Sequence, residues 1–281
     1  MNNVGLFTQL SYDCSQSVTR KYSTSFFSAI KLLRPDLREP IHAVYGMVRF
    51  ADEIVDTFHE FDKQALLKKF KEDTFEAISQ GISLNPILQS FQKAVKRYNI
   101  GDDLIEAFFR SMELDLQKQD YLSREEFEEY IYGSAEVVGL MCLCIFCDGD
   151  QKLYDSLKVY AKALGAAFQK INFLRDLQSD IDDLDRCYFP NFKKGSFNEV
   201  QKRQIEKDIE NDFELAYEGI KRLPVSARFG VYVAYRYYMA LFKKVKKSNA
   251  EAILEQRIRI PNHIKLVIVL KAGLRNQLNL I

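Results

Sequence analysis

The 281-residue sequence contains no tryptophan, only six prolines and only twelve glycines. Proline and glycine mark the turns that separate short strands, so their scarcity argues against a β-rich fold. Alternating apolar and polar runs bounded by Asn-Gly or Asp-Gly turns are also absent. Apolar residues instead recur at steps of three and four, which is the spacing of amphipathic helices.

The chain also lacks an excess of charge of one sign, because 40 Lys and Arg residues are balanced by 39 Asp and Glu residues. A net charge of +1 provides no general attraction to nucleic acid, which we therefore do not expect as a partner. The basic run at 243–247 is interpreted as the solvated last turn of a helix rather than as a membrane contact.

Five cysteines are an odd number in a chain too long to depend on disulfide bonds. Cys144 and Cys147 form one C-x-x-C inside an apolar run, with no second pair and no nearby histidine to complete a zinc site. We interpret them as core residues of a protein in the reducing cytoplasm. The N-terminus shows no secretory signal, and no uninterrupted apolar stretch approaches the length of a bilayer span. The protein is expected to be soluble or at most peripheral to a membrane.

The helical spacing predicts an all-α bundle, and the absence of any linker or repeat predicts one domain, residues 1–281. The few prolines and glycines divide this domain into ten helices, expected at about 16–31, 38–57, 62–80, 85–98, 101–117, 124–147, 150–184, 198–221, 225–248 and 262–278.

Two of these helices carry acids among apolar neighbours. On the first, residues at steps of four, three and four fall within about 60° of one face: Tyr45, Arg49, Asp52 and Asp56. On the second, a stripe at steps of four and its polar flanks comprise Asn172, Asp176, Asp180, Gln169 and Arg175. The apolar surroundings indicate that both stripes point inward.

Buried like charges are unfavourable unless a cation compensates them. Mg²⁺ takes hard oxygen ligands and binds through one or two carboxylates together with substrate phosphates. Two acidic faces opposed across a cavity could hold such ions, which would stabilise a departing diphosphate, with Arg49 and Arg175 as further phosphate donors. A single D-x-x-x-D pair is weak evidence for a metal site, whereas two such stripes together indicate one.

Five stretches in this order resemble the squalene/phytoene synthase family over nearly the whole chain: 22–27 (YSTSFF), 45–56 (YGMVRFADEIVD), 129–139 (EYIYGSAEVVG), 169–180 (QKINFLRDLQSD) and 185–190 (DRCYFP). The resemblance implies a helical isoprenoid synthase fold with a central tunnel. It also implies a Mg²⁺-dependent prenyl transferase, in which Mn²⁺ could replace Mg²⁺, joining two isoprenyl diphosphates head to head through a cyclopropyl intermediate.

The resemblance assigns roles to individual positions of this chain. The implied metal ligands are Asp52, Asp56, Asn172, Asp176 and Asp180, of which the four aspartates also count as catalytic. Tyr130 matches a tyrosine beside the reacting carbons. The implied substrate-binding residues are Ser23, Phe26, Tyr45, Arg49, Gln169, Arg175, Tyr238 and Arg257, the last two in a loosely matching stretch. Ser134 and Glu136 depart from the family pattern, and the helical angle from Tyr130 favours Glu136 facing away from the tunnel.

The product stays open at this point. Loss of a proton would give phytoene or dehydrosqualene, whereas hydride from NADPH would give squalene. Because Ser23, Phe26 and Ile30 share one helix face and Ile30 is modest in size, the sequence favours two C20 substrates, geranylgeranyl diphosphate, and phytoene for carotenoid biosynthesis. The alternatives are a squalene or dehydrosqualene synthase using farnesyl diphosphate, an elongating prenyl synthase or terpene cyclase, and a non-catalytic scaffold relative. Peripheral membrane contact would suit such water-insoluble molecules, although no motif establishes it.

Overall fold

The computed structural model describes residues 3–117, 123–182, 188–190, 197–255, 258–278 and 281. Every regular element among these residues is a helix, as the sequence predicted. The first part of the chain forms α1 (Asn3–Tyr22), α2 (Thr24–Ile30), α3 (Pro35–Asp56), α4 (Lys63–Gln80), α5 (Pro86–Tyr98) and α6 (Asp102–Gln117). The second part forms α7 (Arg124–Ile131), η1 (Tyr132–Glu136), α8 (Val137–Cys147), α9 (Gln151–Asp182), α10 (Glu199–Arg222), α11 (Val225–Lys247), α12 (Ala250–Glu255) and α13 (Asn262–Gln277).

The N-terminal helix differs from the prediction in its start and in its end. Helix begins at Asn3, well before residue 16, and the predicted segment 16–31 is divided at Ser23. Ser23 has extended backbone angles (φ −143°, ψ 95°), and its hydroxyl accepts a hydrogen bond from the Phe26 amide at 3.2 Å. Ser23 is therefore the N-cap of α2, which ends α1 and changes the direction of the chain.

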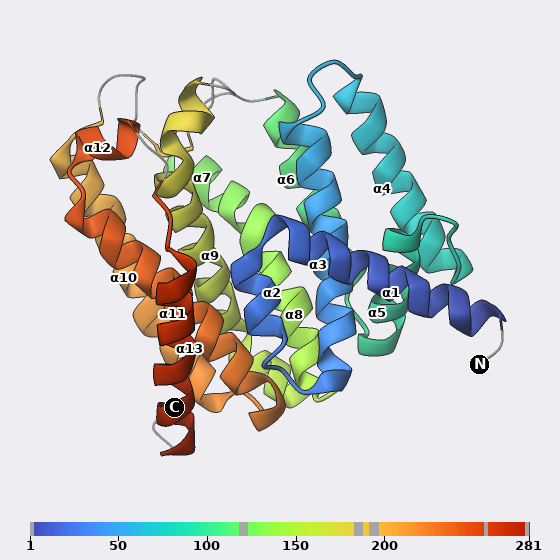
Figure 1. Cartoon of the computed structure of the whole chain (residues 1–281). Coiled ribbons are helices and arrows are strands. Elements are labelled where there is room, and N and C mark those ends of the chain that lie inside the picture. The colour runs from blue at the N-terminus through green and yellow to red at the C-terminus, as the bar shows by residue number, and fades with distance from the viewer. Residues whose placement is uncertain (1–2, 118–122, 183–187, 191–196, 256–257, 279–280) are drawn as a thin grey trace.

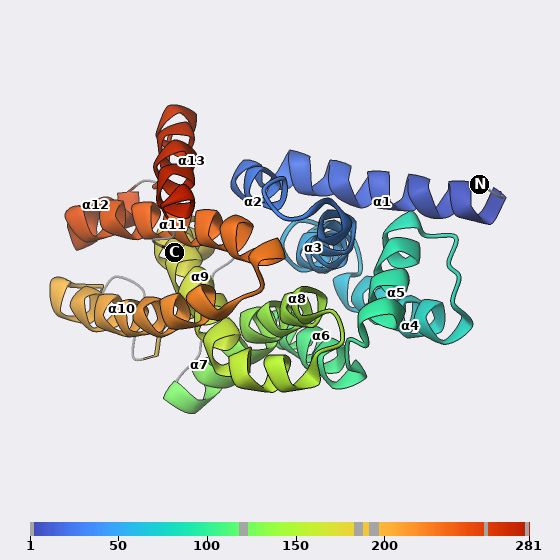
Figure 2. The same cartoon turned by 90° about the horizontal axis from the view of Figure 1, so that it is seen from below.

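Three helices form the centre of the bundle: α3, α9 and the continuous helix made of α7, η1 and α8. In Figure 1, α3 and α9 run toward the same end of the molecule, while the third helix runs between them in the opposite direction. Figure 2 shows α10 to α13 on one side of this centre and α1, α4 and α5 on the other. Each side has its own cluster of buried apolar side chains, and both clusters contact α8.

The central helix contains a turn of a different kind. Residues Tyr132–Glu136 form a π-helical turn between α7 and α8, so that Arg124–Cys147 is one continuous helix of 24 residues. By length and composition it could cross a membrane, although the sequence predicted no such segment. Because 56% of its apolar window is buried inside the protein, this is the core helix of the bundle.

Two glycines allow α8 and α9 to approach closely. A Cβ atom on Gly139 would lie 2.7 Å from the Ala161 carbonyl oxygen, and one on Gly165 would lie 2.5 Å from the Ala135 carbonyl oxygen. Only glycine fits such backbone contact. The close contact fixes the central helix against α9, which carries the second acidic stripe.

Candidate active site

One cavity of about 510 Å³ lies between the two apolar clusters. Its lining changes from apolar to polar along each central helix. On α3 the lining residues run from Ile41 and Val44 to Asp52 and Asp56, and on α9 they run from Leu157 to Asp180. The central helix runs the other way, with its polar lining first. The cavity therefore has one acidic end and one apolar end, as a charged headgroup with a long apolar tail requires.

The first acidic stripe faces the cavity as predicted. Asp52 and Asp56 both line it and are partly buried. Burial raises the pKa of Asp52 to about 8. The negative charges of Asp56 and, to a smaller extent, Asp115 add to this shift, while Arg49 opposes it. Binding of a cation would therefore stabilise the ionised carboxylates at this end of the cavity.

Arg49 lies on the same wall. Its guanidinium carbon is 4.4 Å from the centre of the Tyr22 ring, and it forms an ion pair with Glu53. Its Nε atom is buried and has no hydrogen-bond partner among the described residues. A buried cationic donor without a partner at the edge of a cavity is suited to an anionic ligand such as a diphosphate.

The second acidic stripe lines the same cavity, since Asn172, Asp176 and Asp180 are all among its wall residues. Gln169 and Arg175 lie beside them. Arg175 Nε donates to Asp176 at 3.0 Å, and its Nη2 bonds the second carboxylate oxygen, so the side chain is held in a fixed orientation. The structure thus brings together the two stripes that the sequence placed on separate helices.

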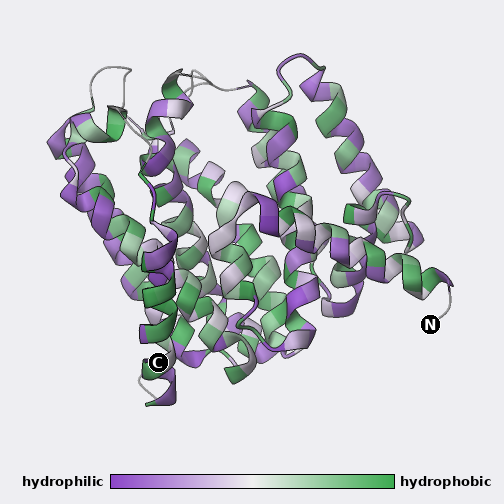
Figure 3. Cartoon of the chain, in the orientation of Figure 1, coloured by the Kyte–Doolittle hydropathy of each residue, from purple (hydrophilic) through white to green (hydrophobic). Residues whose placement is uncertain are grey.

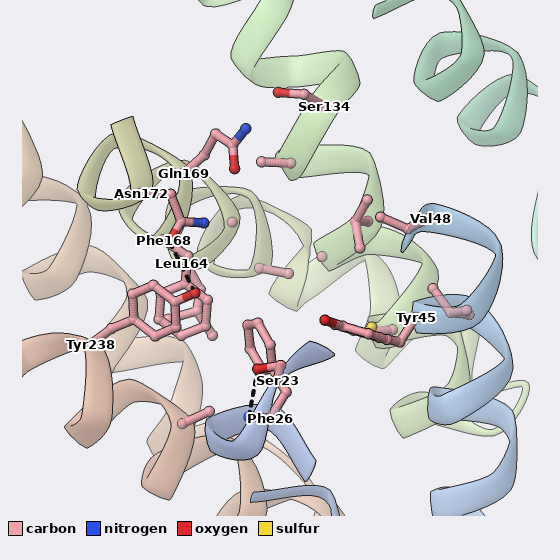
Figure 4. Close-up of a pocket in the computed structure, with 18 of the residues that line it drawn as sticks. Ser23, Phe26, Tyr45, Val48, Ser134, Leu164, Phe168, Gln169, Asn172 and Tyr238 are labelled. Carbon is pink, nitrogen blue, oxygen red and sulfur yellow. Dashed lines mark hydrogen bonds between the residues drawn. The ribbon is translucent and has the colours of Figure 1, made fainter. Parts of the chain in front are cut away.

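Aromatic rings from α2, α3, α9 and α11 lie close together at the cavity (Figure 4). Phe26 projects from α2 between Tyr45 and Tyr238, at ring distances of 6.0 and 5.7 Å. Tyr238 stacks on Phe168 at 3.8 Å and donates a hydrogen bond to Asn172 Oδ1 at 3.2 Å. Burial raises the pKa of both Tyr45 and Tyr238, which keeps the two phenols protonated.

Tyr130 also lines the cavity, and its partner is a residue that the sequence did not single out. Its hydroxyl donates to Asp115 Oδ2 at 2.6 Å. Asp115, on α6, is 6% exposed and lines the same cavity. Tyr130 is stacked near Phe173 and Tyr188, at 5.9 and 5.1 Å. The only sequence signal for Asp115 is an acid at a core-facing position of an amphipathic helix.

The two positions that depart from the family pattern have opposite orientations. Ser134 lines the cavity, and its buried hydroxyl has no hydrogen-bond partner among the described residues. Glu136 is not a wall residue and forms an ion pair with Lys162 at 2.9 Å. Glu136 therefore faces away from the cavity, as its helical angle predicted.

The oxygen donors of the two stripes fit magnesium only in part. Within the described ranges, no group of three His, Cys, Asp or Glu side chains could hold a metal ion by itself. Mg²⁺ commonly binds through one or two carboxylates and completes its octahedron with waters and substrate phosphates. Carboxylates and an amide around one cavity fit such an ion when a diphosphate supplies further ligands.

The remaining sequence-based assignments are also accounted for. Ser23, Phe26, Tyr45, Gln169 and the other proposed site residues line one cavity. The single exception is Arg257, which lies outside the described residues, as does the first half of the 185–190 stretch. The two cysteines of the C-x-x-C lie on α8, where burial raises their thiol pKa values to about 11 and 12 and disfavours metal-binding thiolates.

Over the residues that the structure describes, the chain is a strand-free bundle around a cavity that is acidic at one end and apolar at the other, and this is the isoprenoid synthase fold. The family model of squalene/phytoene synthases matches residues 19–192, so the chain belongs to the squalene/phytoene synthase family of prenyltransferase-type enzymes.

Relatives extend this assignment over the whole chain. The phytoene synthase of Arthrospira platensis is 25% identical over 94% of this chain and 93% of its own length. The 15-cis-phytoene synthase of a Paracoccus species is 27% identical over 87% of this chain and 84% of its own length. A crystal structure of a dehydrosqualene synthase superposes with a TM-score of 0.80 at 20% identity, covering 96% of this chain and 98% of that one. Squalene synthase HpnC from Alicyclobacillus acidocaldarius gives 0.73 at 19% identity, over 85% and 94%. These structures share the fold.

Proposed function

We propose that this protein is a Mg²⁺-dependent phytoene synthase, which condenses two geranylgeranyl diphosphates head to head through a cyclopropyl diphosphate in carotenoid biosynthesis. The observation that carries the proposal is the graded cavity, in which both acidic stripes meet at one end and a long apolar space begins behind them. The similarity to phytoene synthases over most of the chain supports it.

The polar end would bind the diphosphates. Arg49 and Arg175 offer forked donors, while Ser23, Tyr45 and Gln169 offer neutral ones. Magnesium, held by oxygens of the two stripes and of the substrate, would supply the positive charge that stabilises the departing diphosphate. The two partly buried arginines keep their charge throughout, so they would balance the negative charge that develops on the leaving oxygen.

The wall behind the acids would guide the allylic cations. The side chains of Phe26, Phe168 and Phe173 line the cavity, and aromatic ring faces attract positive charge. Their packing also excludes water, which would otherwise quench the cation to an alcohol. The Tyr130 hydroxyl donates a hydrogen bond to Asp115, so the lone pairs of its oxygen remain available to accept a hydrogen bond or a proton.

The side chains at the apolar end of the cavity would limit the length of the isoprenyl tail that fits. Ile30 is buried and lines the cavity together with Leu33, Phe146 and Leu157. A branched aliphatic side chain at position 30 leaves more space than an aromatic ring would, which supports C20 over C15 tails. The structural likeness to a dehydrosqualene synthase keeps farnesyl diphosphate as the second candidate substrate.

The experiment is an incubation of the purified protein with radiolabelled geranylgeranyl diphosphate and Mg²⁺, followed by hydrocarbon extraction. We expect labelled C40 hydrocarbon, and none with EDTA. Parallel reactions with farnesyl diphosphate, with and without NADPH, separate squalene from dehydrosqualene formation. Efficient conversion of farnesyl diphosphate with no C40 product would overturn the phytoene assignment, and turnover unaffected by EDTA would overturn the metal assignment.

A further inference from the structure

Helix α13 exposes an apolar face that the fold does not cover. It packs against α11 through its inner side, where Ala272 is buried and Ile268 and Val269 join the core. Its outer side carries large apolar residues that are 61–68% exposed: Leu266, Leu270, Leu274 and Leu278. Figure 1 shows α13 standing at the surface in front of α11, and Figure 3 shows hydrophobic residues recurring along it.

These leucines form one stripe. They are spaced by four residues, so each lies about one turn beyond the last and about 40° further round the helix, in a slowly winding row. Val267, 45% exposed, extends the stripe on its flank. Single exposed apolar residues are ordinary on a soluble protein, but a contiguous row of this length marks an interaction surface.

The charged residues of α13 have one sign. The helix contains three Lys and Arg residues and no Asp or Glu, and α11, on which it packs, also contains no Asp or Glu. Lys271 and Arg275 lie on α13 itself, beside the leucines. This local excess contrasts with the net charge of +1 for the whole chain. An apolar stripe bordered by cations complements an anionic lipid surface, where acyl chains take the leucines and headgroups take the charges.

The first turn of α13 lies beside the start of α2. Lys265 donates a hydrogen bond to Thr24 Oγ1 at 2.8 Å, which ties α13 to the start of α2. The preceding residue, Ser23, lines the cavity, and α2 also packs on α11. A membrane in contact with α13 would therefore be close to the cavity wall that α2 provides.

We propose that α13 docks this protein on the surface of an anionic bilayer, with its leucine stripe in the boundary between headgroups and acyl chains. At 16 residues the helix is about 24 Å long, which is shorter than the hydrocarbon core, so it lies on the membrane and does not span it. The proposed function supplies the reason, since isoprenyl substrates and a C40 hydrocarbon partition into lipid, but lipid binding itself requires no turnover.

The absence of tryptophan allows a direct test. Leu270→Trp places the only tryptophan of the chain on the stripe, and Leu84→Trp places it on the loop between α4 and α5, where Leu84 is 92% exposed. With vesicles of equal parts phosphatidylcholine and phosphatidylglycerol, we expect the emission of Leu270→Trp to shift to the blue and to be quenched by brominated lipid. Emission of Leu84→Trp should not change. Equal responses at the two positions would overturn the proposal.

Vesicle co-sedimentation tests the same surface without a probe. We expect Leu270→Glu with Leu274→Glu to lower the partition coefficient at least about tenfold, while Leu84→Glu leaves it unchanged. Binding of the unmodified protein should weaken when phosphatidylglycerol is omitted or salt is raised. A protein that fails to bind these vesicles, or that forms a dimer dissociated by the two glutamates, would contradict membrane docking. The same variants should retain turnover in detergent solution, so failure here is distinct from failure of the proposed function.

Discussion

Asp52 lowers the stability of the folded chain at neutral pH, a loss that the proposed metal site would explain. Its pKa is near 3.9 in an unfolded chain and about 8 in the folded one, because burial and Asp56 disfavour its charge. The folded state therefore binds the proton more tightly, and stability falls as pH rises from about 4 to 8. A cation at the acidic end of the cavity would reverse this loss.

We predict that Asp52→Asn raises the free energy of unfolding of the metal-free protein at pH 8 by about 1–3 kcal/mol and abolishes turnover. The gain should fall to about a third at pH 5, where only the unfolded chain ionises, and should vanish below the unfolded pKa of about 3.9. Urea unfolding at the two pH values measures the first effect, and product formation measures the second. A variant less stable than the parent at pH 8 would contradict the origin given for the pKa shift.

Asp115 holds the hydroxyl of Tyr130, and this pair gives a second test at the residue scale. Asp115→Asn keeps the size of the side chain but weakens the acceptor, so we expect kcat to fall at least about tenfold with little change in KM. Steady-state kinetics gives the split. The control is Asp103→Asn, an exposed acid on the same helix, which should leave both constants unchanged. A rise in KM alone would indicate that Asp115 only shapes the pocket.

At the scale of elements, helical spacing in the sequence predicted the two acidic helix faces of the site, but it did not identify Asp115 or the break at Ser23. Steps of three and four identify a helix face, so the two acidic stripes were found without a structure. Asp115 has no repeating partner on its own helix, and its contact with Tyr130 joins two helices, so no local pattern reports it. The division at Ser23 was missed because apolar spacing continues through it, although serine is a favoured N-cap. Turns of the π type have no such residue signature.

The crossing of α8 and α9 depends on glycine, and the chain offers a matched control. Gly165→Ala would place a Cβ atom 2.5 Å from the Ala135 carbonyl oxygen, so we expect a loss of about 1–3 kcal/mol. Gly273→Ala on α13 meets no atom within 4 Å and should stabilise the protein by up to about 1 kcal/mol, because glycine is unfavourable within a helix. Thermal unfolding of both variants measures the difference, and a stabilised Gly165→Ala would show that the helices can separate at little expense.

At the scale of the whole molecule, two apolar clusters enclose one cavity, and its depth sets which substrates fit. Ile30 belongs to one cluster, lies next to Ala29 of the other and lines the cavity. The overall bundle could be predicted from sequence because helical periodicity is strong throughout. The length of the cavity could not, since it depends on side chains contributed by distant helices.

We predict that Ile30→Trp fills the apolar end, lowering C40 formation from geranylgeranyl diphosphate at least about tenfold while farnesyl diphosphate remains acceptable. Competition between the two labelled substrates in one reaction gives the ratio directly. Ile82→Trp, at an exposed position outside the cavity, is the control and should leave the ratio unchanged. An unaltered C40 yield from Ile30→Trp would show that another residue limits tail length.

The π-helical turn has a geometric consequence for the enzyme. Five residues of the central helix line the cavity at steps of four: Tyr130, Ser134, Val138, Cys142 and Phe146. In a regular α-helix this row would drift about 160° around the axis, and its last members would point away from the ligand. The additional residue that the π turn accommodates removes about 100° of that rotation. One helix thereby keeps a continuous wall facing the cavity for roughly 24 Å, from its acidic end to its apolar end.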